Sequence, residues 1–176
     1  MNDMKKLSQK ITRNVLLLCS MLLLAAALTG CGGTKDADQS DTQAAVDMDA
    51  LCKNMLEADT TLPEMVTVTD KDDQAELNFG SFSDFSYDRV AAYFYAYAKE
   101  GGSEEIAVVE LKDAQDAAAL MTTMQDHLKD RRGALESYAP DQLTLIDHAV
   151  IKQNGRYVAM IISPKSGLVQ QAFVVD

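Results

Sequence analysis

The segment YFYAYAKEGGSEEIAVVEL, residues 93–111, decides the fold of this chain. Its second half, Glu105–Leu111, is rich in aliphatic and β-branched residues and predicts a strand. In its first half, aromatic side chains stand at every second position, which favours another strand, although a helical spacing that ends at glycine is also possible. Gly101-Gly102 between the halves is typical of a hairpin turn. We therefore expect an antiparallel hairpin here.

A second hairpin is expected further along the chain. Asn154-Gly155, the strongest short hairpin signal in the sequence, separates Leu143–Lys152 from Arg156–Ser163. Between the hairpins we expect a long helix from a cap at Asp113 to about Tyr138, because apolar residues recur along one face. These residues are Ala117, Met121, Met124, Leu128 and Leu135.

Shorter elements flank the two hairpins. Asp47 is expected to cap a helix that runs to about Asp59 and has one apolar face. Met65–Thr69 predicts a short strand, and a turn then leads to another short strand near Glu76–Phe79. The tail, Leu168–Val175, is expected to form one more short strand.

Two hairpins joined by a long helix predict an α+β fold. We expect an antiparallel sheet with a ββαββ core, the long helix across one face, and the N-terminal helix and aromatic segment over the other. The strands within Glu105–Leu111 and Arg156–Ser163 are apolar on both sides, so they are expected at the centre of the sheet. The expectation is one domain over residues 47–176.

The N-terminal part has the pattern of an export signal. A basic segment, residues 1–14, precedes the uncharged run Val15–Leu28, whose helix would be about 21 Å long and too short for a bilayer core. The run ends in Leu28-Thr29-Gly30-Cys31, which resembles the lipobox of bacterial lipoproteins. This resemblance implies a signal peptide over residues 1–30 and a diacylglycerol on Cys31. Fatty acyl chains such as palmitate would then anchor the protein to a cell membrane, facing outside the cytoplasm. An ordinary cleaved signal and an uncleaved anchor are the alternatives.

The remainder of the chain is strongly acidic. Residues 31–46 comprise Cys31 and a polar segment that we expect to be a flexible tether. From Cys31 onward, 12 Lys and Arg face 26 Asp and Glu, a net charge of −14. Phosphate binding needs clustered basic residues, so we expect no nucleic-acid partner. After processing, Cys52 would be the one cysteine left, and its place on an apolar helix face predicts a buried thiol.

Four stretches carry a family resemblance. They are Glu105-Ile106-Ala107-Val108, the Lys112-Asp113 helix entry, the Tyr138-Ala139-Pro140 helix exit, and Asn154-Gly155-Arg156-Tyr157-Val158. Over about Leu51–Ser163 the chain resembles the bacterial lipoprotein family catalogued as Domain of Unknown Function 4358. The resemblance implies a shared fold and placement at the membrane, and it transfers no activity and no catalytic residue.

The sequence contains no recognised catalytic or metal-binding motif. His127, on the flank of the long helix, is expected to face solvent, and His148 is expected to be a surface or structural residue. The stretch Asp70–Glu76 alternates like the start of a calcium loop, but Ala75 stands where the turn needs Gly. We expect no catalytic residue, no metal ligand and no cofactor, with a looser cation site at this turn as an alternative.

The aromatic residues are unevenly distributed, since eight of eleven lie within residues 79–97. If Tyr93, Tyr95 and Tyr97 share an exposed strand face, they would form a stripe that contacts a ligand or partner. The favoured interpretation is that they complete the core.

These observations favour a non-catalytic binding or interaction module for an envelope protein or another envelope component. The alternatives are a small-molecule or cation-binding lipoprotein and an envelope enzyme without a recognisable signature.

Overall fold

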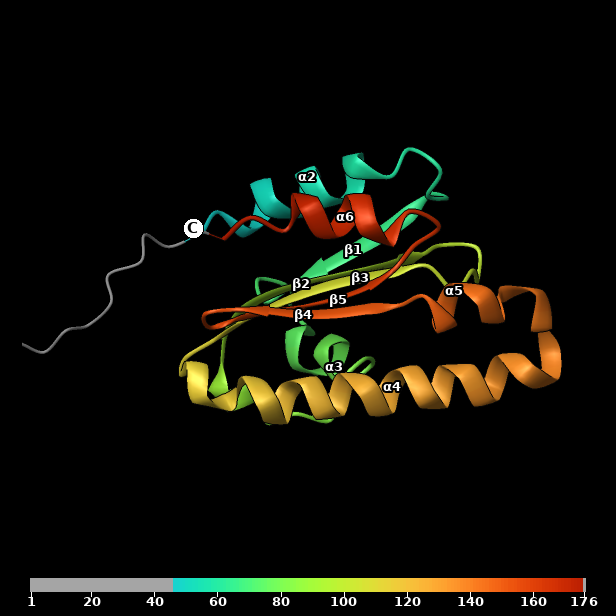
Figure 1. The fold of residues 1–176 in the computed structure, drawn as a ribbon. Helices are drawn as coiled ribbons and strands as arrows, with labels where there is room; N and C mark the ends of the chain where they lie inside the picture. The colour runs from blue at the N-terminus through green and yellow to red at the C-terminus, as the bar shows by residue number, and fades with distance from the viewer. Residues whose placement is uncertain (1–45, 176) are drawn as a thin grey trace, which may run out of the picture. The chain divides into compact units, whose positions relative to one another are not determined.

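An antiparallel sheet forms the centre of the computed structural model, which describes residues 46–175 (Figure 1). Its strands follow the order β1-β2-β3-β5-β4. They are β1 (Met65–Thr69), β2 (Val90–Ala98), β3 (Glu105–Leu111), β4 (Val150–Asn154) and β5 (Tyr157–Ile162). The predicted signal peptide, Cys31 and the predicted tether up to residue 45 lie outside the described residues.

Both predicted hairpins are confirmed. In the first, β2 pairs with β3 so that Tyr95 lies opposite Ala107, and the turn contains Gly101 with φ of 79°. In the second, β4 and β5 meet at Asn154-Gly155, and Gly155 has φ of 55°. Such left-handed backbone conformations are readily adopted by glycine. Every residue of β3 and β5 is buried, as expected for the two central strands.

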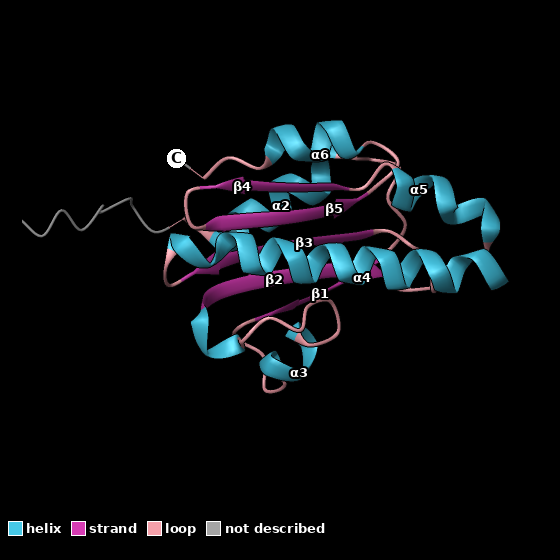
Figure 2. Cartoon of the chain, turned by 60° about the horizontal axis from the view of Figure 1, so that its bottom comes forward, coloured by secondary structure: helices cyan, strands magenta, loops and turns pink. Residues whose placement is uncertain are grey.

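Helices cover both faces of the sheet (Figures 1 and 2). They are α2 (Met48–Ala58), α3 (Ala75–Phe79), α4 (Ala117–Tyr138), α5 (Leu143–Asp147) and α6 (Ser166–Ala172), with short 3-10 turns at Tyr87–Arg89, Ala114–Asp116 and Pro140–Gln142. The predicted cap of α2 is present, since the Asp47 carboxylate accepts from the backbone N–H of Asp49 and Ala50. Asp113 accepts from the N–H of Gln115 and so caps the 3-10 turn that precedes α4, not α4 itself, whose N-cap is Asp116. Within residues 46–175, no helix is both long and apolar enough to cross a membrane.

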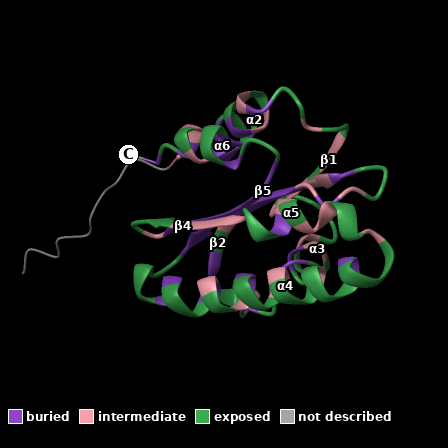
Figure 3. Cartoon of the chain, turned by 45° about the vertical axis from the view of Figure 1, so that its right-hand side comes forward, coloured by how far each residue is buried: buried purple, intermediate pink, exposed green. Residues whose placement is uncertain are grey.

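The core has a layer on each side of the sheet. Phe79, Tyr93 and Met124 represent the layer beneath α3 and α4, whereas Met55 and Val169 belong to the layer beneath α2 and α6. Figure 3 shows the buried strands between these helical layers. The observed architecture is the predicted α+β fold, with α3, α5 and α6 as additional helices.

Some local predictions are wrong. Glu76 and Phe79 lie in helix α3, because a single turn here directs Phe79 into the core. The tail forms α6, in which Val169 and Phe173 are four residues apart and both buried, a helical period. The strand expected over Leu143–Lys152 begins only at Val150, since helix α5 comes first.

The aromatic segment does not cover the face opposite α4, as had been expected. It is strand β2 itself, and successive side chains of a strand point to opposite faces. Tyr93 and Tyr95 therefore pack beneath α4, while Phe94 packs beneath α2.

Candidate functional site

The connection between β1 and β2, residues 70–89, forms one wall of the candidate site. Aromatic rings hold it against the sheet: the ring centroids of Phe79 and Tyr93 lie 5.5 Å apart, and those of Phe82 and Tyr95 lie 4.6 Å apart. The Tyr93 hydroxyl donates to the backbone carbonyl of Ala75 at 2.7 Å. The long connection is thus fixed in place beside α4.

The three tyrosines of the predicted stripe share the α4 face of β2 and do not form an exposed surface. Tyr93 is 0% exposed, Tyr95 is 6% exposed, and Tyr97 is half-buried. Burial raises the pKa of the Tyr93 and Tyr95 hydroxyls well above their ordinary value. Two of these side chains belong to the core, so we do not propose the stripe as a binding surface.

Glu105 at the start of β3 is the centre of a buried polar cluster. Its side chain is 4% exposed, and Nε2 of His127 lies 2.7 Å from its Oε2. The hydroxyl of Tyr95 also bonds to Glu105, and the nearby carboxylate adds to the rise that burial causes in the Tyr95 pKa. His127 itself is only 14% exposed, so the expectation of a solvated histidine is wrong.

Arg131, one turn after His127 on α4, compensates the charge of Glu105. Its Nε lies 2.8 Å from Oε1 of Glu105, and its terminal nitrogen donates to the carbonyl of Gly102 at 3.3 Å. The Nε–H makes no directed hydrogen bond within the described residues, so the contact with Glu105 is an ion pair. A buried carboxylate needs such compensation, because desolvation penalises an unpaired charge.

His127 also faces a pocket of about 210 Å³ between α4 and the connection, which we call the His127 pocket. Its polar lining side chains are Ser81, Ser83, Asp84, Thr123, Asp126, His127 and Asp130. The Nε2–H of His127 donates to Glu105. No described residue forms a hydrogen bond with its other ring nitrogen, Nδ1. The pocket therefore combines an oriented imidazole with three carboxylates and several hydroxyls.

The hydroxyls of the pocket have structural partners. Ser83 Oγ lies 2.6 Å from Thr123 Oγ1 and accepts from the backbone N–H of Phe85 at 3.2 Å. The first of these bonds joins the connection to α4, and the second lies within the connection. Ser83 is accordingly part of the wall of the pocket.

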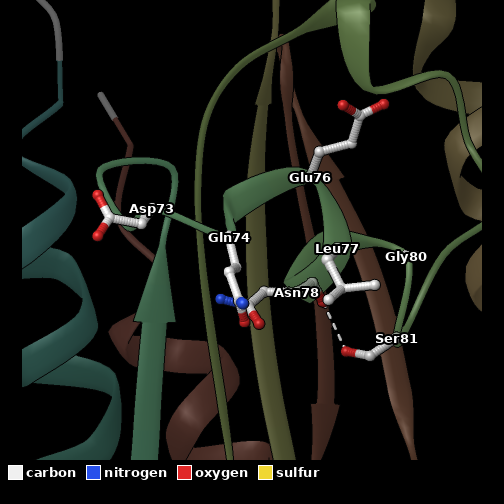
Figure 4. A pocket seen from close by; sticks show the side chains of 7 residues that line it. All are labelled: Asp73, Gln74, Glu76, Leu77, Asn78, Gly80 and Ser81. Atoms are coloured by element: carbon white, nitrogen blue, oxygen red, sulfur yellow. Dashed lines mark hydrogen bonds between the residues drawn. The ribbon is translucent and has the colours of Figure 1, made fainter.

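An open hollow of about 870 Å³ lies on the outer side of the same connection, around α3 (Figure 4). Gly80 and Ser81 line both this hollow and the His127 pocket. Leu77 is 71% exposed here, and Ser81 Oγ donates to the carbonyl of Asn78 at 2.6 Å. The hollow offers an apolar contact beside the polar pocket.

The turn at Asp70–Glu76, which was considered as a cation site, uses two of its carboxylates to accept hydrogen bonds from the backbone. The carboxylate of Asp72 accepts from the N–H of Thr69 at 2.7 Å, and that of Asp70 accepts from the N–H of Tyr93 at 3.2 Å. Within residues 46–175, no group of three His, Cys, Asp or Glu side chains is arranged to hold a metal ion. His148 is exposed, and its Nδ1 lies 2.7 Å from the Thr144 carbonyl.

Cys52 is buried on α2, as predicted. Burial raises the pKa of its thiol to about 11. A thiol with so high a pKa is a poor nucleophile near neutral pH.

Sequence reasoning missed the cluster at Glu105. The signal that was present is a glutamate at the first and at the sixth position of EIAVVEL, a segment interpreted as a fully buried strand. A buried carboxylate requires a partner. His127 and Arg131 stand four residues apart on one helix face, and both contact the carboxylate of Glu105.

The described residues define an α+β domain with a polar pocket beside its central sheet. The chain belongs to the family described as Domain of unknown function (DUF4358), whose model matches residues 64–163. That range contains all five strands and α4. No curated protein and no solved structure matches the chain significantly. The function must accordingly be argued from the site.

Proposed function

We propose that this protein is a lipid-anchored extracytoplasmic binding module without catalytic activity, and that the His127 pocket takes a small ligand that carries an ammonium group. The observation that supports this proposal is the composition of the pocket. Asp84, Asp126 and Asp130 contribute carboxylates, and the lining contains no Lys or Arg. Carboxylates that line a polar pocket attract a cation and accept its N–H donors.

The size of the pocket limits the ligand. Its volume of about 210 Å³ is below the range of about 300–1,000 Å³ typical of drug-sized ligands, so a small amine fits better than a nucleotide or a peptide. The imidazole of His127, oriented by Glu105, supplies a further hydrogen-bonding group at a fixed position. The carboxylates are not grouped as metal ligands, which favours an organic cation over a metal ion.

The anchor is proposed from the sequence. Leu28-Thr29-Gly30-Cys31 follows a basic segment and an uncharged run, and two acyl chains on Cys31 would hold the protein stably at a membrane. The predicted tether, up to residue 46, would keep the acidic domain clear of the lipid.

Thermal unfolding tests the binding proposal with defined probes: spermidine, ethanolamine and glucosamine. A probe that binds only the folded state raises stability, by about 3 kcal/mol at 100 times its dissociation constant. We expect at least one probe to raise the unfolding temperature of the wild type and to lose this effect in Asp126→Asn. Glu57→Gln, which removes one exposed charge from α2, is the matched control and should keep the effect. Equal shifts in both variants would count against the pocket.

An envelope enzyme is the second candidate, and the pairing of His127 with a buried carboxylate is the observation that favours it. An imidazole held in this way is suited to act as a general base. Chromatography after incubation with the stabilising probe separates the two candidates. A binding module returns the probe unchanged, whereas an enzyme consumes it.

A further inference from the structure

The C-terminal helix α6 has an uncharged outer side on an acidic domain. Residues 166–175, SGLVQQAFVV, contain no charged side chain, whereas the chain from Cys31 onward carries 26 Asp and Glu against 12 Lys and Arg. The exposed residues of this segment are Gly167, Leu168, Gln171 and Val174. Together with the exposed Ala50 and Asn54 of α2, they make up what we call the α6 surface.

Burial in the core explains only the inner side of α6. Val169 and Phe173 are 0% and 4% exposed and pack on the sheet, as their spacing requires. Leu168 and Val174, by contrast, are 47% and 58% exposed. The packing of the core therefore does not account for these two aliphatic side chains on the outer side of the segment.

The α6 surface lies where the chain enters the described domain. A hollow of about 320 Å³ is lined by Val46, Asp47, Ala50, Leu51 and Asn54 together with Ala172 and Val174. The backbone N–H of Val46 lies 3.5 Å from the hydroxyl of Tyr157, in the same layer. Figure 1 shows the start of the described chain next to its C-terminal end. A chain that leads from Cys31 therefore reaches the domain at this surface.

The fifteen positions from Cys31 to Val46 span at most about 50 Å, so an anchored domain would stay close to its bilayer. Such tethering gives a high effective concentration, at which a weak surface contact is populated. Acidic faces of the domain are repelled by anionic headgroups, whereas an uncharged face with aliphatic side chains is not. Asp47 lines the hollow beside Val174, and Lys165 directly precedes α6, so one acidic and one basic side chain stand at the border of the α6 surface.

We propose that the α6 surface contacts the phospholipid bilayer. This orientation depends on the proposed lipid anchor. Leu168 and Val174 would lie at the level of the headgroups. The helices α3 and α4 lie on the opposite side of the sheet, so the His127 pocket would point away from the membrane, toward its ligand (Figures 1 and 2).

The quenching of a fluorescent label by brominated lipid tests this orientation. The protein used is the processed, lipid-anchored chain, bound to phosphatidylcholine vesicles. A bimane label is attached at Gln171→Cys, and the matched control carries it at Gln125→Cys, an exposed position on α4. Cys52 stays unlabelled in the native protein because it is buried. We expect the label at position 171 to be quenched at least about threefold more than the label at position 125, because an interfacial surface lies within reach of the acyl chains.

A second comparison examines the aliphatic side chains themselves. The double variant Leu168→Asp/Val174→Asp should lose the quenching at position 171, whereas Leu77→Asp, which changes an exposed leucine at α3, should retain it. Flotation with the vesicles shows whether the protein is anchored. If the protein floats, equal quenching at positions 171 and 125, or no effect of the double variant, would overturn the orientation. A protein that does not float would overturn the lipid anchor and the orientation with it.

Discussion

Nε2 of His127 on helix α4 lies 2.7 Å from Oε2 of Glu105 on the central strand β3. This bond joins helix α4 to a carboxylate inside the fold. Arg131, on the same helix, supplies the compensating positive charge. The polar cluster thus supports both the packing of α4 and the orientation of the imidazole in the pocket.

Replacement of Glu105 should show how much this cluster stabilises the domain. We expect Glu105→Gln to lower the free energy of unfolding by about 2 kcal/mol, because Arg131 loses its carboxylate partner in a half-buried environment. Urea unfolding measures the difference. Glu104→Gln makes the same change one residue earlier, outside the cluster, and should alter stability by less than about 0.5 kcal/mol. Equal stabilities of the two variants would show that the cluster contributes little.

Asp59 should make a pH-dependent contribution to stability. It is 1% exposed, and burial alone would raise its pKa, but hydrogen bonds from Ser163, Thr61 and the backbone of Lys165 lower the pKa to about 2. A carboxyl group whose pKa is lower in the folded state stabilises the fold above its unfolded pKa of about 4, and this contribution is lost as the pH falls toward 2.

We expect Asp59→Asn to reduce the free energy of unfolding by about 2 kcal/mol at neutral pH, and the difference from wild type to shrink between about pH 4 and pH 2. Chemical unfolding at several pH values checks both parts. Asp73→Asn, a change at an exposed turn residue, is the control and should show neither effect. A difference that stays constant down to pH 2 would contradict the assigned pKa.

The thiol of Cys52 should be unreactive in the folded protein. Burial raises its pKa to about 11, so at about pH 8 the thiolate fraction is very small. We expect slow modification by Ellman's reagent in the native state and rapid modification of one thiol per processed chain in denaturant. Rapid modification in the native state would contradict the buried position. Two reactive thiols in denaturant would contradict the modification of Cys31.

Two glycines should respond to alanine substitution with opposite signs. Gly155 has φ of 55° in the turn between β4 and β5, so Gly155→Ala should destabilise the protein by about 1 kcal/mol. Gly133 lies inside α4, and nothing stands within 4 Å of the position its Cβ would occupy. Gly133→Ala should therefore stabilise the protein by about 0.5–1 kcal/mol. Thermal unfolding distinguishes the two, and destabilisation by both would contradict the assigned geometry at Gly133.

The elements that the sequence predicted correctly have strong local signals. Gly101-Gly102 and Asn154-Gly155 specify turns, the alternation in β2 has a period of two, and Asp47 is a suitable cap for α2. Helices α3, α5 and α6 were missed because five or seven residues are too short for a period to be established. Their conformation is decided by the packing of Phe79 and Val169 against the sheet.

The candidate site was less accessible to sequence reasoning because it depends on how α4 docks. His127 stands on the flank of the helix, beside Asp126, and its neighbours in sequence suggest a solvated position. Only the docking of α4 over the start of β3 brings Glu105 within reach. The tyrosines illustrate the same limit, since the alternation in β2 does not reveal which face is covered.

The lipid anchor on Cys31 is the claim on which both the placement of the protein at a membrane and its proposed orientation rest. The most direct test is mass spectrometry of the N-terminal peptide of the protein isolated from cell membranes. We predict that this peptide begins at Cys31 and carries the mass of a diacylglycerol, and that Cys31→Ala yields an unprocessed chain or releases the protein. A membrane-derived peptide that retains residues 1–30, or that begins at Cys31 without a lipid, would contradict the account.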